Sequence, residues 1–307
     1  MQITASMVKE LRELSGAGMS ACKNALVEAN GDVKRATEIL REKGLAAAAK
    51  KAGRVAAEGL VATAISTDGK KGAIVEVNSE TDFVAKNEDF VAFVKQVAVE
   101  VLNSDVSTID ALLEKKWTPD PAQAVKDVLT NKVATIGENI GIRRFEKYEA
   151  DGRVVDYIHG GGRIGVMLEI AADDINDAVL EAGRNICMQI AAMSPQYLDR
   201  SAVSAEFLAN EKEILTQQAN NENAESDKPK PPQVIEKMVE GRLSKQLKEI
   251  CLLDQEYVKE DKKTVAEYLK SVGSGTKIVR FTRYEKGEGI ERKEEDFAAE
   301  VQKAMNA

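Results

Sequence analysis

Apolar residues in the first fifty positions recur every three or four residues, the spacing that places them on one face of a helix. Met7, Val8, Leu11 and Leu14 form the first such set. Two more sets follow, and each lies between a residue type that favours a helix N-cap and one that favours a helix end. The segment is therefore expected to form three short helices, with residues 46–51 as a helical link. The expected caps and ends are Thr4 or Ser6 with Gly16, Ser20 with Asn30-Gly31, and Asp32 with Gly44.

After Gly53 the apolar spacing changes to two, which is typical of strands. Strands are expected at 59–65, 73–77 and 142–148, and helices at about 88–102, 112–117 and 122–135. The same order then recurs, with strands at 154–158, 164–170 and 277–284 and a helix at 175–193.

The two sets also share short stretches of sequence. Ile74-Val75-Glu76-Val77 resembles Met167-Leu168-Glu169-Ile170, and Phe145-Glu146-Lys147-Tyr148 resembles Phe281-Thr282-Arg283-Tyr284. Two copies of one strand–turn–strand–helix–strand unit explain this similarity. Coincidence is the alternative, because strands draw on few residue types.

Two apolar stripes interrupt the second unit before its closing strand. The first contains Phe207, Leu208, Ile214 and Leu215, and the second runs from Ile235 to Leu247. The polar stretch 220–232 joins them, so an antiparallel helical hairpin with a mobile tip is expected.

A last short helix is expected at 297–305. The expected domains are 1–54, 55–150, 151–196 with 251–288, the inserted hairpin 197–250, and a C-terminal module at 289–307.

Composition narrows the possible partners. The 307 residues carry 43 Lys and Arg against 51 Asp and Glu, a formal net charge of −8, which argues against nucleic acid as a direct partner. No apolar stretch approaches the ~20 residues needed to span a bilayer, and the first residues do not form a secretory signal. The three cysteines are odd in number and far apart, as in reduced cytosolic proteins. We therefore expect a cytoplasmic protein without metal, cofactor or membrane partner.

Enzyme motifs are weak in this chain. Residues 160–165 formally match G-x-G-x-x-G, but that motif needs a helix after the glycines and a strand is expected here. His159 is the only histidine, so a two-histidine metal site is excluded, and no neighbouring Cys or Ser suggests a nucleophile. We expect no catalytic residue.

Two segments are better candidates for binding. In the first, Thr81-Asp82-Phe83-Val84 follows a buried strand. Either Thr81 or Asp82 caps a helix and Phe83 fills the core, or Phe83 protrudes and anchors in a partner while Asp82 brings a charge to it. In the second, Met19 follows two glycines between helices, where it could dock on a partner or fill the core.

Several stretches, in order along the chain, resemble the elongation factor Ts family of translation factors. The longest is Glu76-Val77-Asn78-Ser79-Glu80-Thr81-Asp82-Phe83-Val84-Ala85. The sequence departs from the family at Ser20, where Met is frequent, at Asn24, where Lys is frequent, and in the length of the tip at 220–232. The other matching stretches are 8–13, 16–19, 22–26, Ile136-Gly137-Glu138-Asn139-Ile140, 159–160, 163–166, 236–242, 287–290 and 296–301.

The resemblance implies an α+β fold: a UBA-like helical N-terminal domain, a core of two related α+β subdomains, an inserted antiparallel coiled coil and a C-terminal helical module. It also implies a non-enzymatic guanine nucleotide exchange factor whose partner is elongation factor Tu. By the same resemblance, Thr81, Asp82, Phe83 and Val84 would disturb the partner's Mg²⁺. Further partner contacts would come from Leu11, Arg12, Met19, His159 and Phe297.

Two other function classes stay open on the residues alone. An enzyme would need a polar pocket with a perturbed titratable group. A scaffold protein would use the helical domain and the hairpin to bind other proteins without affecting a bound nucleotide.

Overall fold

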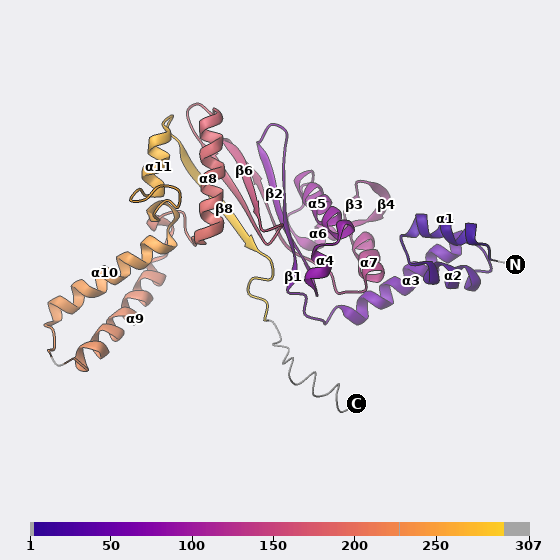
Figure 1. Ribbon diagram of the computed structural model, residues 1–307, viewed down its shortest axis with the longest axis horizontal. Helices are drawn as coiled ribbons and strands as arrows, with labels where there is room; N and C mark the ends of the chain where they lie inside the picture. Colours follow the sequence, from indigo (N-terminus) through magenta and orange to yellow (C-terminus); the bar gives the residue numbers. More distant parts are fainter. Residues whose placement is uncertain (1–2, 227, 292–307) are drawn as a thin grey trace.

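The protein is an elongated assembly of helices and sheets. The computed structural model describes residues 3–226 and 228–291. A three-helix unit lies at one end, a pair of long helices at the other, and two sheets with their covering helices lie between them (Figure 1).

The N-terminal unit consists of α1 (Ala5–Ser15), α2 (Met19–Glu28) and α3 (Val33–Lys51). The Thr4 hydroxyl accepts a hydrogen bond from the Met7 N–H, and Gly16 ends α1 in the left-handed conformation. Apolar side chains of all three helices form a small core of their own. Its fully or nearly buried members are Val8, Leu11, Cys22, Ala25, Leu26, Ala29, Ala36 and Ile39.

Two predicted helix boundaries in this unit are wrong. The second helix is capped by Gly18 and not by Ser20, and no side chain bonds to its first N–H groups. The third helix does not end at Gly44 but continues to Lys51. Gly44 is buried where α3 crosses α7 (Val125–Ile136), and a Cβ atom there would lie 3.5 Å from that of Ala134. Its small size permits close helix packing, so this glycine does not act as a stop signal.

The first sheet is antiparallel with the order β1–β2–β5, formed by Glu58–Ile65, Lys71–Ser79 and Gly141–Glu149. Helix α5 (Glu88–Leu102) packs its apolar face on this sheet, and the short α4 (Asp82–Ala85) links β2 to it. Helices α6 (Ile109–Glu114) and α7 complete the layer.

A small two-stranded sheet was missed by the sequence prediction. The helix expected at 112–117 is α6, which ends at Glu114, so residues 116–117 form β3 (Lys116–Trp117) instead. Residues 122–124, also expected to be helical, belong to β4 (Asp120–Ala124). Pro119 and Pro121 explain the difference, because each proline favours an extended conformation for the residue before it. Trp117 is buried against Phe93 of α5, with ring centres 5.8 Å apart.

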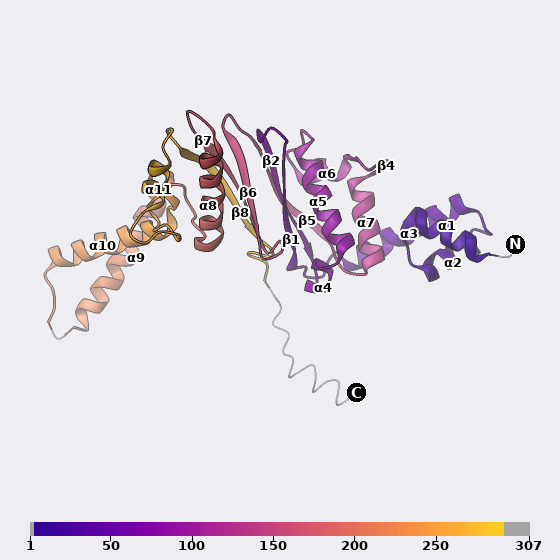
Figure 2. The ribbon, with the colours of Figure 1, turned by 45° about the horizontal axis from the view of Figure 1, so that its top comes forward.

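The second sheet repeats the order of the first. It consists of β6 (Arg153–His159), β7 (Ile164–Ala171) and β8 (Lys277–Glu285), and α8 (Asp177–Met193) packs on it. The two sheets also bury one shared cluster, so the core has the layer order helix, sheet, sheet, helix (Figures 1 and 2). The buried members of this cluster are Val61, Ile74, Tyr148, Val154, Met167 and Tyr284.

The long helices α9 (Ala205–Ala224) and α10 (Pro232–Ile250) lie side by side in both ribbon views. The connection between them is shorter than the expected 220–232, because α9 continues to Ala224 and the Asn223 side chain bonds the backbone of Lys230.

The short helix α11 (Val265–Val272), which was not predicted from the sequence, packs beside α8. Two 3₁₀ turns, Arg200–Ala202 and Leu252–Asp254, complete the chain order.

Candidate partner-binding surface

The turn that follows β2 presents an aromatic side chain to solvent. Thr81 caps α4, its hydroxyl accepting from the Val84 N–H at 3.4 Å. Phe83 is 81% exposed, so it is not a core residue. Val84, one residue on, is buried in the core of the first sheet. Its side chain therefore anchors the turn from beneath, and its predicted part in disturbing the partner's Mg²⁺ stays a prediction.

The backbone before Phe83 is tied to a second loop. The carboxylate of Glu138, which follows α7, accepts from the N–H groups of Glu80 and Thr81 at 3.1 and 3.0 Å. Its other oxygen accepts from the Thr81 hydroxyl at 2.6 Å. In return, the carboxylate of Glu80 accepts from the N–H of Asn139 at 2.5 Å. In the sequence Glu138 stands out only as part of the matching stretch Ile136-Gly137-Glu138-Asn139-Ile140, and its bonds to residues 80 and 81 have no local signal.

Asp82 carries a negative charge beside Phe83. Its carboxylate lies 2.6 Å from the ammonium group of Lys86. The hydrogen bond from Lys86, with the nearby charge of Lys286, lowers the pKa of Asp82 below its ordinary value. The turn therefore presents an ionised acid and an exposed aromatic ring at adjacent positions.

His159 lies at the exposed end of β6, in the turn that leads into β7. Its Nδ1 is 3.0 Å from the Tyr157 hydroxyl. The glycines that follow have positive φ angles and lead directly into the strand β7. This confirms the sequence interpretation that G-x-G-x-x-G here forms a hairpin turn and does not precede a phosphate-binding helix.

The segment after β8 connects these two turns. The Lys286 N–H donates to the carbonyl oxygen of Arg163, beside the His159 turn. The Lys286 side chain pairs with Glu58 at the start of β1, and its charge reaches Asp82. Gly287 donates its N–H to Glu76 at 2.7 Å. The Phe83 turn and the His159 turn therefore lie at the same end of the sheets, with residues 285–290 between them.

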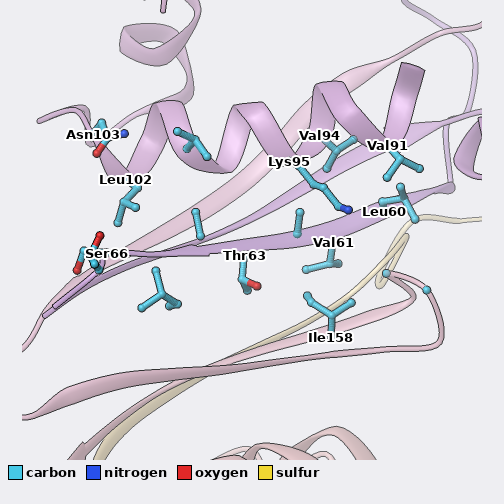
Figure 3. Close-up of a pocket in the computed structure, with 17 residues that line it drawn as sticks. Leu60, Val61, Thr63, Ser66, Val91, Val94, Lys95, Leu102, Asn103 and Ile158 are labelled. Carbon is cyan, nitrogen blue, oxygen red and sulfur yellow. The ribbon is translucent and has the colours of Figure 1, made fainter. Parts of the chain in front are cut away.

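An apolar groove of about 870 Å³ runs along β1, between α5 and the β6–β7 turn (Figure 3). Leu60, Val94 and Ile158 are among the residues that line it. Among the residues that line it, Lys95 is the single titratable one, and Figure 3 shows it reaching from α5 towards the strand. Acid–base chemistry requires a positioned donor or acceptor near a reacting group, usually with a partner that tunes its pKa. This groove offers no such pair.

The predicted contacts Leu11, Arg12 and Met19 belong to the N-terminal unit, which lies at one end of the molecule, away from the two sheets (Figure 1). Arg12 is exposed and Met19 is 50% exposed, so both are accessible. Leu11 is fully buried between the three helices, so its side chain belongs to the core of this unit and its contact with the partner stays a prediction. Leu14, which was not predicted, is 65% exposed. Phe297 lies outside the described residues.

Residues 3–226 and 228–291 contain no group of three or more His, Cys, Asp or Glu side chains arranged to hold a metal ion. In the same part of the chain, none of the helices combines the length and apolarity that crossing a membrane requires.

Comparison with known proteins gives one consistent result. The family model described as elongation factor TS matches residues 80–288. An elongation factor Ts of Clostridium perfringens (strain 13 / Type A) is 54% identical over 306 residues, which cover 98% of each chain. Those of Clostridioides difficile (strain 630) and Clostridium novyi (strain NT) are 52% and 51% identical and cover 99% of each chain. The matched range contains the Phe83 turn, Glu138 and His159.

Proposed function

The chain belongs to the elongation factor Ts family, which acts in translation elongation, and from this premise we propose that it is a guanine nucleotide exchange factor. It binds elongation factor Tu, disturbs the Mg²⁺ and phosphate site of that GTPase, and so promotes the release of GDP and its exchange for GTP. One observation carries the proposal. Phe83 is 81% exposed on a turn that is fixed at both sides, and an ionised Asp82 precedes it.

The mechanism follows from the chemistry of the partner's site. Mg²⁺ requires near-ideal octahedral geometry, so a small displacement of its surroundings weakens its binding. Thr81, Asp82 and Phe83 enter beside the metal, and Val84 holds the turn to the core. The exchange factor prefers the distorted, metal-free form of the GTPase, so its binding lowers the affinity of the GTPase for GDP. By linkage, bound GDP lowers the affinity of the GTPase for the exchange factor by the same factor. Entry of GTP then displaces the exchange factor.

The N-terminal unit supplies a second contact in this proposal. Arg12 and Met19 are accessible there, and a partly exposed methionine adapts to different apolar surfaces. His159 adds a contact near the Phe83 turn. Two linked contacts raise each other's effective concentration, so weak binding at the helices keeps the turn engaged.

The domain organisation that we propose follows the same family. Residues 1–54 form a UBA-like domain with its linker, and residues 55–150 form the first core subdomain. Residues 151–196 and 251–288 form the second subdomain, and an antiparallel coiled coil at 197–250 is inserted into it.

Two alternative classes predict different behaviour. An exchange factor makes and breaks no covalent bond, whereas an enzyme would need reactive groups that the β1 groove lacks among the residues that line it. A scaffold protein would bind partners without altering a bound nucleotide.

The deciding experiment uses elongation factor Tu loaded with fluorescently labelled GDP. Addition of this protein with excess unlabelled GTP should accelerate the loss of fluorescence, and the rate should saturate with its concentration. Binding without acceleration would favour the scaffold alternative. Conversion of the nucleotide would favour an enzyme.

A further inference from the structure

We propose that Glu138 is a positioning residue that holds the Phe83 turn in the orientation in which it meets the GTPase. The inference rests on the proposed function and adds to it a residue that lies 55 positions away in the chain from the turn it controls. Glu138 touches neither nucleotide nor metal in this proposal, and it acts through the backbone of Glu80 and Thr81.

The turn needs such support because it is short. Helix α4 has four residues, and an isolated helical turn of that length is unstable since nucleation costs more than a single turn returns. Phe83 adds little packing of its own because most of its surface is exposed. Val84 and Ala85 anchor the far side of the turn in the core. The near side, at Glu80 and Thr81, has no comparable apolar anchor, since both residues are polar.

Glu138 supplies the missing anchor through three hydrogen bonds. One carboxylate oxygen accepts from two successive backbone N–H groups, those of Glu80 and Thr81. The other accepts from the Thr81 hydroxyl at 2.6 Å, the same hydroxyl that caps α4. Hydrogen bonds to an ionised acceptor are about twice as strong as neutral ones. In addition, the Asn139 N–H donates to the Glu80 carboxylate, so each of the two loops both donates to and accepts from the other.

The chain delivers Glu138 to this place through Gly137. This glycine ends α7 with a φ angle of +89°, and its N–H donates to the carbonyl oxygen of Val133 at 3.0 Å. A left-handed residue redirects the chain sharply at a helix end, and glycine adopts that conformation without strain. The end of α7 therefore sets where the Glu138 carboxylate lies, and this carboxylate sets where Phe83 points.

This arrangement predicts which kinetic quantity depends on Glu138. A loose Phe83 turn would still be brought to the GTPase by the N-terminal helices and the His159 turn, so the half-saturating concentration should change little. Displacement of the metal requires Phe83 in one place, and a misplacement of about 1 Å can cost ~100-fold in rate. The maximal rate of GDP release should therefore fall.

The experiment compares Glu138→Ala, Glu138→Gln and the control Glu114→Ala, whose carboxylate pairs with Lys126 on α7. Glu138→Ala should lower the maximal rate about tenfold or more. Glu138→Gln should recover most of it, because the amide oxygen still accepts from both N–H groups and the amide N–H₂ donates to the Thr81 hydroxyl. Thr81→Val, which removes the hydroxyl alone, should give an intermediate loss. Glu114→Ala should match the wild type.

Two further measurements separate positioning from general destabilisation. Amide hydrogen exchange should accelerate at residues 80–84 in Glu138→Ala and stay unchanged in β7 and α8. The double variant Glu138→Ala/Phe83→Ala should be no slower than Phe83→Ala, since both changes remove the same action.

Either of two results would overturn the inference. The first is a maximal rate of GDP release in Glu138→Ala equal to that of the wild type. The second is a double variant whose rate falls by the product of the losses seen in Glu138→Ala and Phe83→Ala. Failure of the proposed function is distinguishable from this, because then the wild-type protein itself would not accelerate GDP release. In that case the hydrogen-exchange comparison still decides whether Glu138 holds the turn.

Discussion

The guanidinium group of Arg144 lies 4.1 Å from the centre of the Tyr284 ring, although the two residues belong to different sheets. The reverse contact also exists, with Arg280 of the second sheet 4.0 Å from the ring centre of Tyr148 in the first. Each arginine stands four residues before the tyrosine of its own strand. The two sheets therefore exchange equivalent contacts across their interface, as two copies of one unit would.

Each of these arginines also pairs with a glutamate, and in both sheets that glutamate stands where the register of the strand pair shifts. Arg144 binds Glu76 at 2.5 Å and Arg280 binds Glu169 at 2.8 Å. The strand register shifts directly after Glu76 in β2 and directly after Glu169 in β7. Short strands that were similar by chance would not share a bulge and an ion pair at the same position, so coincidence is a poor explanation of the similarity.

The two glutamates nevertheless differ in their surroundings. Glu76 is fully buried and also accepts from Arg143 and from the Gly287 N–H. Gly287, with a φ angle of +70°, passes so close to β1 that a Cβ atom would lie 2.0 Å from the carbonyl oxygen of Ala57. Glu169 is buried as well, at 5% exposure, but its arginine partner is 43% exposed.

This difference predicts unequal costs for equivalent substitutions. Arg144→Met leaves Glu76 buried with one arginine fewer, and we expect a loss of about 2–4 kcal/mol in the free energy of unfolding. Arg280→Met also leaves a buried carboxylate, since Glu169 is 5% exposed, but water can take the place of the 43%-exposed guanidinium group, so we expect about 1 kcal/mol. Urea unfolding of both variants measures the difference. Equal losses in the free energy of unfolding would show that the deeper burial of Glu76 does not make its arginine pair the more stabilising of the two.

Glu76 should also make stability depend on pH. Burial alone would raise its pKa, but hydrogen bonds from Gly287, Asn78 and Arg144 outweigh burial, and the pKa of Glu76 is lowered. A carboxylate with a lowered folded-state pKa stabilises the protein above its unfolded pKa of about 4.3 and loses that contribution as the pH falls through the folded value.

Glu76→Gln should therefore be less stable than the wild type at pH 7, by about 2–4 kcal/mol. The gap should narrow as the pH is lowered from about 4.3 towards the folded-state pKa. Urea unfolding of both proteins between pH 3 and 7 tests this. A gap that stays constant across that range would mean that the charge of Glu76 is not what stabilises the fold.

The sequence predicted the elements whose pattern is local. Helices with clear apolar periodicity, such as α5 and α8, and the strands of both sheets were expected close to their observed positions. The errors arose where tertiary contacts override local preference. Gly44 continues a helix because α7 packs against it, and Pro119 and Pro121 redirect a segment whose apolar residues fit a helix.

The candidate site could be predicted only in part for a similar reason. The sequence singled out the Phe83 turn, but it could not decide between an exposed and a buried Phe83, since an aromatic residue at such a junction suits either. Leu11 and Val84 stand beside accessible residues in the sequence, yet the structure buries both. Glu138 lies too far along the chain for spacing to reveal its bonds to Thr81.

Phe83→Ala should leave the fold intact and slow GDP release. An exposed side chain contributes little to folding, so the free energy of unfolding should change by less than about 0.5 kcal/mol. An aromatic anchor at an interface commonly contributes about 2 kcal/mol or more, which corresponds to a ~30-fold slower release. The matched control is Phe93→Ala, since Phe93 is buried in the core. That variant should lose about 3–5 kcal/mol of stability. A large stability loss in Phe83→Ala would contradict the proposed role.

His159→Ala should have a small effect on exchange. His159 is exposed and its structural partner is the Tyr157 hydroxyl, so the substitution removes one surface contact. Most interface residues contribute less than about 1 kcal/mol, and we expect release to slow by less than about fivefold. Tyr157→Phe, which removes the same hydrogen bond and keeps the imidazole, serves as the control. A loss as large as that of Phe83→Ala would mean that His159 acts directly on nucleotide release.

The hairpin of α9 and α10 can be shortened at a natural boundary, because its apolar contacts form two separate groups. The group next to the core contains Val203, Leu247 and Cys251, and the outer group contains Ala219, Ile235 and Val239. The Gln246–Glu211 hydrogen bond lies on the inner side of the division between them.

Deletion of residues 213–241, with a four-residue glycine and serine turn in their place, removes the outer group and keeps the inner one. The two helices already lie side by side at the cut, so closing the chain there adds little conformational entropy cost. Thermal unfolding of the core should change little, because the deleted residues pack against one another. GDP release from elongation factor Tu should proceed at close to the wild-type rate, since the residues assigned to release lie at the opposite side of the sheets. A well-folded deletion variant whose activity is near background would show that the hairpin itself grips the partner.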